Sequence, residues 1–442
     1  MKVTLLVPPS LRPSIARTAD GSRFQPPLGL MALAAVIADE HDISLMDGQL
    51  HKYTVESIVD AVADDRPDLL GISLPFSGLW RPGIEVARGV REAVGPDVTI
   101  VWGGNVSTFR HEDLLRDYDA DIVVRFEADR TFPELLRRIE GAGDWRATPG
   151  ISWRDGDGIR TNEFGGYIED LDELPFPAYR FLEHEERYDR VLISTRGCPH
   201  GCIYCSTRQM WGRWRARSVE NVLAETAWHV ESADPDLITF TDDNFAATSR
   251  RALEICEGIK RAGWDFDWGF SARVELITRD LVSAGAATNV RRIFFGIESG
   301  SARVLDKLGR RYTPEDVYQT VEMCMQAGIA PICSFMIGIP YETRKDAEQT
   351  LDMLENLNTP LVQLHVFTPL IGTPVCRFPA DYGVTIYDPD PDRDTIDSSV
   401  NHRTEHLSRE EITELYLDGK GIVAERAAEG PAYREWLKSL RG

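Results

Sequence analysis

No apolar run in this 442-residue sequence approaches the roughly 18 residues that a bilayer-spanning helix needs, so we expect neither a membrane anchor nor a signal peptide. Basic residues are also in short supply, since 49 Lys and Arg stand against 71 Asp and Glu for a formal net charge of −22. Because nucleic-acid-binding proteins hold phosphates with clustered Lys and Arg, we do not expect a nucleic acid partner. We expect a cytoplasmic protein whose charge favours a cationic small molecule.

Cysteine is rare as well, with seven in the chain, and a cytoplasmic protein of this size is not expected to use them in a disulfide framework. Three of the seven crowd into the eight residues from 198 to 205. The other four lie in apolar segments and are interpreted as small core residues: Cys256, Cys324, Cys333 and Cys376.

Residues 1–145 alternate short apolar runs with amphipathic segments, which predicts βαβ units and a doubly wound, Rossmann-like parallel sheet. No G-x-G-x-x-G motif follows the first strand, so the dinucleotide fingerprint is absent. In such sheets a ligand binds outside the carboxyl ends of the strands, where Gly103 and Gly104 either permit close approach or simply form a tight turn. The strands are expected at 3–7, 43–46, 69–73, 98–102 and 121–124.

Residues 146–185 are rich in turn-forming residues and are predicted to be a linker. A second alternation over 186–378 predicts a partial (β/α)6 barrel, so the fold class is α/β, with functional residues at the carboxyl ends of the barrel strands. Residues 379–442 are expected to form an acidic loop at 388–394 and a small C-terminal helical extension. The six barrel strands are expected at 191–194, 237–241, 268–271, 293–297, 332–337 and 362–367.

The three clustered cysteines, Cys198, Cys202 and Cys205, are spaced C-x3-C-x2-C directly after the first barrel strand. Structural zinc prefers four closed ligands, often as two C-x2-C pairs, and no second pair exists; a Cys3His site using His200 would have unusual spacing. A 4Fe–4S cluster normally takes four thiolates, so three thiolates leave one iron open for a substrate or cofactor. Flanking glycines and a proline favour a loop over a packed helix face.

This cysteine motif, with Tyr204 before its third cysteine, resembles the radical S-adenosylmethionine (SAM) superfamily. The opening Pro26-Pro27-Leu28-Gly29-Leu30 and the turn Trp102-Gly103-Gly104 resemble the subgroup that has an N-terminal cobalamin-binding domain. The resemblance covers about residues 1–378, and further segments agree with it in order: 241–245, 270–273, 296–301, 338–343 and 368–374.

The resemblance implies that the three cysteines hold a 4Fe–4S cluster whose open iron is chelated by SAM. An electron from the cluster, supplied by a donor such as flavodoxin or ferredoxin, would then cleave the S–C5′ bond and release a 5′-deoxyadenosyl radical that abstracts hydrogen from the substrate. The resemblance also assigns the SAM contacts: Tyr204, Gly338 and Pro340 near the adenine, Asp242 or Asp243 at the ammonium, Arg273 at the carboxylate, and Glu298 and Ser299 at the ribose.

Cobalamin binding stays open at this stage. The D-x-H-x-x-G signature for a lower axial histidine is absent, but the subgroup commonly lacks it. Two further departures matter more: relatives often read Gly-Gly-Pro-His where this chain reads Gly103-Gly104-Asn105-Val106, and Gly-Glu-x-Glu where it reads Arg125-Phe126-Glu127-Ala128-Asp129. We expect radical dehydration or deoxygenation of a polyhydroxylated, amine-bearing molecule, as in the dehydratases of aminoglycoside antibiotic biosynthesis, which this chain resembles. The alternative is cobalamin-dependent radical C-methylation of another natural product. A third hypothesis, a non-enzymatic iron–sulfur regulator, has no use for an open iron.

Overall fold

The computed structural model describes residues 1–10, 24–50, 53–387 and 400–429, and the chain divides into two compact units between Asp189 and Arg190. The acidic loop predicted at 388–394 lies outside the described residues. Within the described ranges, no helix combines the length and apolar character needed to span a membrane.

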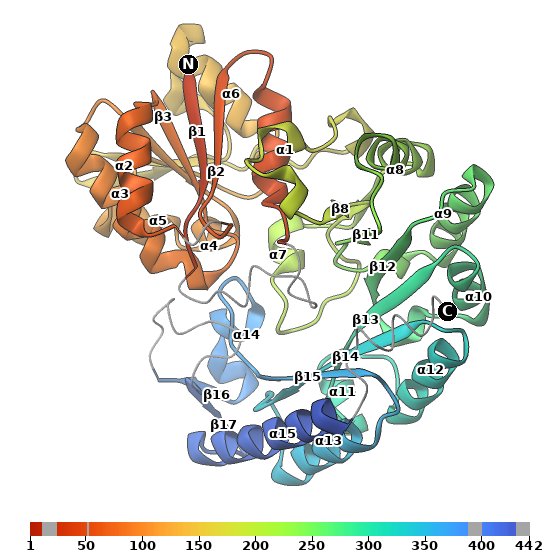
Figure 1. Cartoon of the computed structure of the whole chain (residues 1–442). Coiled ribbons are helices and arrows are strands. Elements are labelled where there is room, and N and C mark those ends of the chain that lie inside the picture. Colours follow the sequence, from red (N-terminus) through yellow and green to blue (C-terminus); the bar gives the residue numbers. More distant parts are fainter. Residues whose placement is uncertain (11–23, 51–52, 388–399, 430–442) are drawn as a thin grey trace. The chain divides into compact units, whose positions relative to one another are not determined.

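The first unit is built on a seven-stranded sheet in the order β2-β1-β3-β4-β5-β6-β7 (Figure 1). Its first five strands are parallel, as predicted: β1 (Lys2–Val7), β2 (Asp42–Asp47), β3 (Leu69–Ser73), β4 (Thr99–Gly103) and β5 (Ile122–Val124). The order 2-1-3-4-5 is that of flavodoxin-like sheets, in which a ligand crevice opens between the carboxyl ends of β1 and β3. The helices of this unit are α1 (Leu28–Ile37), α2 (Val55–Asp65), α3 (Trp80–Val94), α4 (Asn105–Phe109), α5 (His111–Asp117) and α6 (Thr131–Arg137).

The segment predicted as a linker contributes two strands to this sheet, so that prediction is wrong for residues 151–161. β6 (Ile151–Asp155) pairs antiparallel with β5, and β7 (Gly158–Thr161) pairs antiparallel with β6. Ile151 and Trp153 bury their side chains, and Gly156 supplies a positive φ of 60° at the turn. Of the turn residues that suggested a linker, those at 155–158 are therefore the turn of a β-hairpin.

The second unit is a partial barrel of six parallel strands in the consecutive order β8-β11-β12-β13-β14-β15, which confirms the predicted fold. Figure 1 shows these strands as an open arc with α9, α10, α12 and α13 on the outer side. The strands are β8 (Arg190–Leu192), β11 (Leu237–Phe240), β12 (Asp267–Ala272), β13 (Val290–Glu298), β14 (Ala330–Ile337) and β15 (Leu361–Val366). Beside them lie β9 (Thr195–Arg196), β10 (Arg215–Ala216), α7 (Thr207–Trp211), α8 (Val219–Ala233), α9 (Ser249–Ala262), α10 (Arg279–Ala286), α11 (Ala302–Lys307), α12 (Pro314–Gln326) and α13 (Arg344–Asn356).

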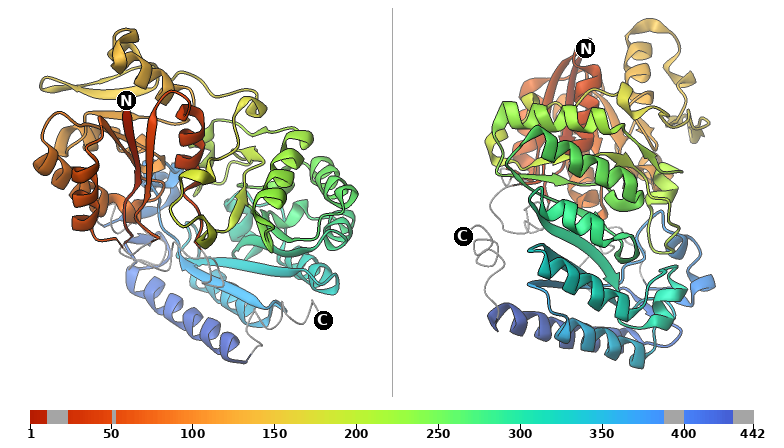
Figure 2. Two further views of the ribbon diagram at one scale, coloured as in Figure 1. Left: turned by 45° about the horizontal axis from the view of Figure 1, so that its top comes forward. Right: turned by 90° about the vertical axis from the view of Figure 1, so that its right-hand side faces the viewer.

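Capping boxes start two of these helices, because the side chains of Thr313 and Thr343 accept hydrogen bonds from the third backbone amide of α12 and α13. After the barrel come α14 (Pro374–Arg377), the antiparallel pair β16 (Val384–Ile386) and β17 (His402–Thr404), and α15 (Arg409–Glu429). The β16–β17 pair was not predicted, since each strand has only three residues and no hairpin turn signal adjoins them. α15 lies alongside α13, as both views in Figure 2 show.

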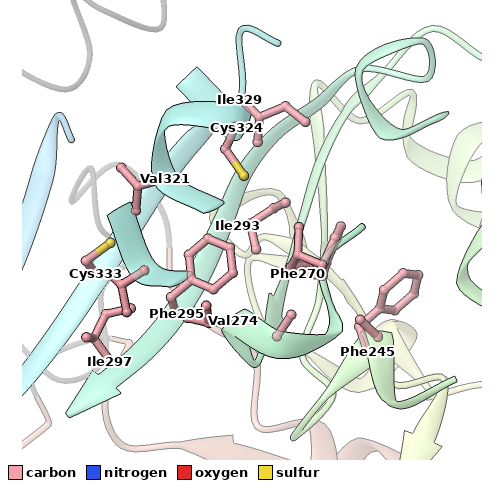
Figure 3. Packing of buried hydrophobic residues seen from close by; sticks show 14 of the residues in the cluster. Phe245, Phe270, Val274, Ile293, Phe295, Ile297, Val321, Cys324, Ile329 and Cys333 are labelled. Atoms are coloured by element: carbon pink, nitrogen blue, oxygen red, sulfur yellow. The ribbon is translucent and has the colours of Figure 1, made fainter. Parts of the chain in front are cut away.

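The barrel core holds three of the four scattered cysteines. Figure 3 shows Cys324 and Cys333 among Ile293, Phe295 and Val321, and both thiols are fully buried. Cys256 is buried in the same cluster, whereas Cys376 on α14 is only partly buried. Burial raises the pKa of the Cys256 and Cys324 thiols to about 12, so these groups behave as small apolar residues, as predicted.

Candidate active site at the three-cysteine loop

The three-cysteine loop begins where β9 ends, beyond the carboxyl end of the first barrel strand β8. Gly197 enters it with a φ of 82°, and a Cβ at this position would lie 2.5 Å from the carbonyl oxygen of Arg213. Only glycine therefore fits this turn. The thiols of Cys198, Cys202 and Cys205 are free and partly buried.

Each of the three thiols has its own hydrogen-bond donor. Burial raises the pKa of Cys198, and a hydrogen bond from the His200 backbone opposes this effect. Burial also raises the pKa of Cys205, and there hydrogen bonds from Thr207 oppose it. Cys202 accepts from Nη1 of Arg273 at 3.2 Å.

This donor set fits thiolates that share a cluster. In the described part of the chain, no three or more His, Cys, Asp or Glu side chains converge on a point where one metal ion would bind. A closed zinc site requires such convergence, whereas a 4Fe–4S cluster binds each thiolate through a different iron. The three cysteines supply three of the four thiolates that such a cluster normally takes.

Tyr204 connects this loop to the end of β13. Its hydroxyl donates to Oε1 of Glu298 at 3.0 Å and accepts from Nε of Arg310 at 2.9 Å, and Arg310 also pairs with Glu298. Burial, followed by the Glu298 carboxylate, holds the pKa of Tyr204 well above its usual range, so the hydroxyl stays protonated. The structure thus brings Tyr204 and Glu298 together, as their shared assignment to SAM requires.

Arg310 was missed by the sequence analysis. It follows Gly309 in the connection between α11 and α12, outside every segment that resembles the family, so no motif pointed to it. The one available signal was the Arg310-Arg311 pair downstream of the β13 end. Tyr312 supports the same region, because its hydroxyl donates to the carbonyl oxygen of Ile297 at 2.9 Å.

Of the two neighbouring aspartates, the structure leaves only Asp243 accessible. Asp242 is buried, and its carboxylate accepts from the backbone N–H of Ser194 at 3.0 Å and from the hydroxyls of Ser194 and Thr195. Burial raises the pKa of Asp242 to about 6, and these hydrogen bonds oppose the shift. Asp243 is exposed at the end of β11, where it accepts from the Thr207 hydroxyl at 3.1 Å. This arrangement favours Asp243 as the ammonium contact.

Ser299 is buried, and its hydroxyl lies 3.1 Å from that of Thr350 and accepts from the N–H of Ser301. The Ser299 hydroxyl is thus bound to α13 and to the residue that precedes α11. The predicted contact between Ser299 and the ribose stays a prediction. Of the two residues predicted for the ribose, Glu298 is the one in contact with the cysteine loop through Tyr204.

Gly338 and Pro340 lie at the carboxyl end of β14, in a turn held from both sides. Oε2 of Glu342 accepts from the N–H groups of Gly338 at 2.7 Å and Ile339 at 3.3 Å, and Nε2 of His402 lies 2.8 Å from the Gly338 carbonyl oxygen. Gly338 has a φ of 82°, and a Cβ there would lie 2.8 Å from Ile412. The turn predicted to meet the adenine is therefore braced by the C-terminal extension.

The buried Glu342 carboxyl makes the free energy of unfolding depend on pH. Its carboxyl is fully buried, and burial raises its pKa to about 8 from 4.5. Since the unfolded chain releases this proton at lower pH than the folded chain, the free energy of unfolding falls as the pH rises from about 4.5 to 8. We expect Glu342→Gln to remove this fall, which amounts to a few kcal/mol between the two pH values. Urea unfolding at several pH values measures it.

The control for this experiment is Glu322→Gln, which removes the same charge from an exposed site on α12. It should leave the slope unchanged. Equal slopes in Glu342→Gln and the wild type would mean that Glu342 is already ionised in the folded protein.

Two neighbouring glycines at the carboxyl edge of the first unit's sheet differ in how closely other atoms pack against them. A Cβ on Gly104 would lie 2.8 Å from the backbone of Leu74, so Gly104 serves the close contact between β4 and the segment after β3. A Cβ on Gly103 would meet only the Val124 carbonyl oxygen at 3.9 Å. Gly103 therefore has no close contact on this side, and no described histidine supplies a lower axial ligand in the D-x-H-x-x-G pattern.

Comparison with known families assigns both units. Residues 192–354 match the family described as the radical SAM superfamily, and residues 19–136 match the B12 binding domain. A relative described as "Uncharacterized methyltransferase PH0819", from Pyrococcus horikoshii, is 32% identical over 381 residues, which cover 84% of this chain and 82% of the relative.

Two solved structures share the fold. Cobalamin-dependent SAM radical enzyme OxsB, solved with aqua-cobalamin and SAM bound, gives a TM-score of 0.77 at 17% identity, covering 100% of this chain and 70% of OxsB. The radical SAM methyltransferase TsrM from Kitasatospora setae, solved with cobalamin and a [4Fe–4S] cluster, gives a TM-score of 0.73 at 15% identity, covering 88% of this chain and 77% of TsrM.

Proposed function

This chain belongs to the radical SAM superfamily and carries a B12-binding domain, and from that premise we propose that it is a cobalamin-dependent radical methyltransferase that acts on a small polar molecule. Its cofactors are a 4Fe–4S cluster, SAM and cobalamin. The cluster supplies the electron that cleaves SAM, and cobalamin supplies the methyl group.

One observation carries this proposal: the same chain holds a three-thiol loop that follows the first strand of a partial barrel and a flavodoxin-like sheet in the region that matches the B12 binding domain. A cluster with three thiolates leaves an iron for SAM. A regulator without catalysis would need neither this open position nor the polar groups at the ends of β11, β13 and β14.

The chain's own residues bind and orient SAM at this loop. Asp243, exposed at the end of β11, accepts the SAM ammonium. Glu298 accepts a ribose hydroxyl while Tyr204 and Arg310 hold its carboxylate in place. The turn at Gly338, braced by Glu342 and by His402, receives the adenine. Burial lowers the pKa of His402 to about 4, so its imidazole stays neutral and donates to the Gly338 carbonyl.

Methyl transfer is favoured over the dehydration that we expected first. The relative with 32% identity is named a methyltransferase, and TsrM is titled a methyltransferase with cobalamin bound. The match of residues 19–136 to the B12 binding domain supports a retained cobalamin site. Dehydration of an aminosugar-like substrate needs no cobalamin, so this domain would then have no ligand to bind.

We propose a cationic, polyhydroxylated substrate and a low-potential flavodoxin or ferredoxin as electron donor. The support for the substrate is the net charge of −22, since carboxylates around a site raise the local concentration of cations. Under this proposal kcat/KM falls as salt is added, because the Debye length shortens to roughly 8 Å at physiological ionic strength.

The test uses protein loaded anaerobically with iron, sulfide and cobalamin, reduced with dithionite, and supplied with SAM that carries a deuterated methyl group. Amine-bearing polyols are offered as substrates and the products are analysed by mass spectrometry. Methyl transfer predicts a product that carries the label, together with 5′-deoxyadenosine. Formation of 5′-deoxyadenosine with an unlabelled, dehydrated product would overturn the proposal and restore the dehydratase hypothesis.

A further inference from the structure

The donors to the three thiols of the cysteine loop differ in origin and in charge. Cys198 accepts a hydrogen bond from the backbone of His200, which lies within the loop. Cys205 accepts from Thr207, which follows the loop, and both of these donor groups are uncharged. Cys202 instead accepts from Arg273, which follows β12, 71 residues further along the chain. One of the three ligand sulfurs therefore receives a charged donor from a different barrel strand.

The protein fixes the Arg273 guanidinium in this position. Its side chain is buried, Nε donates to Oε1 of Glu275 at 2.8 Å, and Nη2 donates to the carbonyl oxygen of Gly309 at 3.2 Å. Nη1 is then directed at the Cys202 sulfur at 3.2 Å. All three nitrogens have protein partners, so the guanidinium is held at the thiol and has little freedom to turn toward a SAM carboxylate.

A positive, hydrogen-bonding group at a ligand sulfur has a defined effect on an iron–sulfur cluster. One-electron reduction adds negative charge that spreads onto the sulfurs, and hydrogen bonds to those sulfurs raise the reduction potential. Arginine stays protonated at every accessible pH, and a buried charge is poorly screened. Arg273 thus stabilises the reduced cluster relative to the oxidised one, with the Glu275 carboxylate offsetting part of its charge.

We propose that Arg273 tunes the reduction potential of the cluster through its contact with Cys202, in place of the SAM-carboxylate role expected from the sequence. The inference rests on the proposed function in that the three cysteines hold the cluster. The step concerned is the uptake of one electron by the oxidised cluster from an external low-potential donor, with no bond made or broken.

The test is a redox titration of the loaded protein without SAM or substrate, with dithionite as reductant and the reduced cluster followed by electron paramagnetic resonance. In Arg273→Gln we expect the ratio of reduced to oxidised cluster at a fixed solution potential to fall roughly tenfold, which is 59 mV for a one-electron couple. Arg273→Lys keeps the charge without the planar fork and should give a smaller fall. Glu275→Gln removes the offsetting charge and should raise the potential.

The matched control is Arg279→Gln, which removes an exposed arginine on α10 and should leave the potential unchanged. If Arg273→Gln fails to load iron, the opposite shifts of Arg273→Lys and Glu275→Gln decide the question. An unchanged potential in loaded Arg273 variants overturns the proposal, and a weaker SAM affinity at that unchanged potential would return Arg273 to the carboxylate. Because the titration omits SAM and substrate, its outcome is independent of whether the enzyme methylates.

Discussion

Cys202→Ala is expected to abolish the brown colour of the anaerobically purified protein and its cleavage of SAM. Cys202 is one of only three thiols on the loop, and two remaining thiolates do not retain a cluster that normally takes four. Iron should fall from about four per chain to background, and 5′-deoxyadenosine should disappear. Iron analysis and chromatography of the products measure both effects.

The control is Cys324→Ala, which removes a thiol of the same chemistry from the barrel core shown in Figure 3. This variant loses packing at a cost of about 1 kcal/mol and should keep its iron and its activity. A Cys202 variant that stays brown and cleaves SAM at the wild-type rate would contradict the assignment of the loop as the cluster site.

Gly104→Ala is expected to weaken cobalamin binding and to destabilise the first unit by about 1–3 kcal/mol through overpacking. The added methyl would lie 2.8 Å from backbone atoms of Leu74, so the end of β4 must move away from the segment after β3. That movement displaces Gly103, which ends β4 at the carboxyl edge of the sheet, where folds of this kind bind their ligands. Absorbance titration with cobalamin and urea unfolding measure the two effects.

Gly95→Ala provides a matched control for backbone strain. Gly95 has a φ of 90° and Gly104 a φ of 93°, so both alanines meet a similar conformational cost of about 1–3 kcal/mol. A Cβ on Gly95 has nothing within 4 Å, so only the Gly104 variant adds a clash. Equal cobalamin affinities in the two variants would show that the β4 turn does not position the corrin.

The fold was predictable because its signals are local and repeat along the chain. The six barrel strands fall within a few residues of their predicted positions, and local sequence also sets the starts of α12 and α13, where Thr313 and Thr343 form capping boxes. The β6–β7 hairpin was mistaken for a linker because the same glycines and aspartates serve both kinds of segment, and only pairing with β5 distinguishes them.

The site was predictable where one motif carries it and much less so where distant segments meet. The spacing of the three cysteines identified the loop, but Arg310 reaches the site from the connection between α11 and α12 and His402 from β17, and neither segment carries a motif. The aspartate pair could not be divided from the sequence alone. Only the structure shows that Asp242 is buried and held by hydrogen bonds from Ser194 and Thr195, and that Asp243 is exposed.

The central claim is that one chain holds both a 4Fe–4S cluster and cobalamin. It is tested most directly by the visible spectrum and iron content of anaerobically purified protein that has been incubated with cobalamin and then desalted. The account predicts corrin bands that survive desalting at a stoichiometric level, superimposed on cluster absorption from about four irons per chain. Cluster absorption without any retained corrin would contradict it.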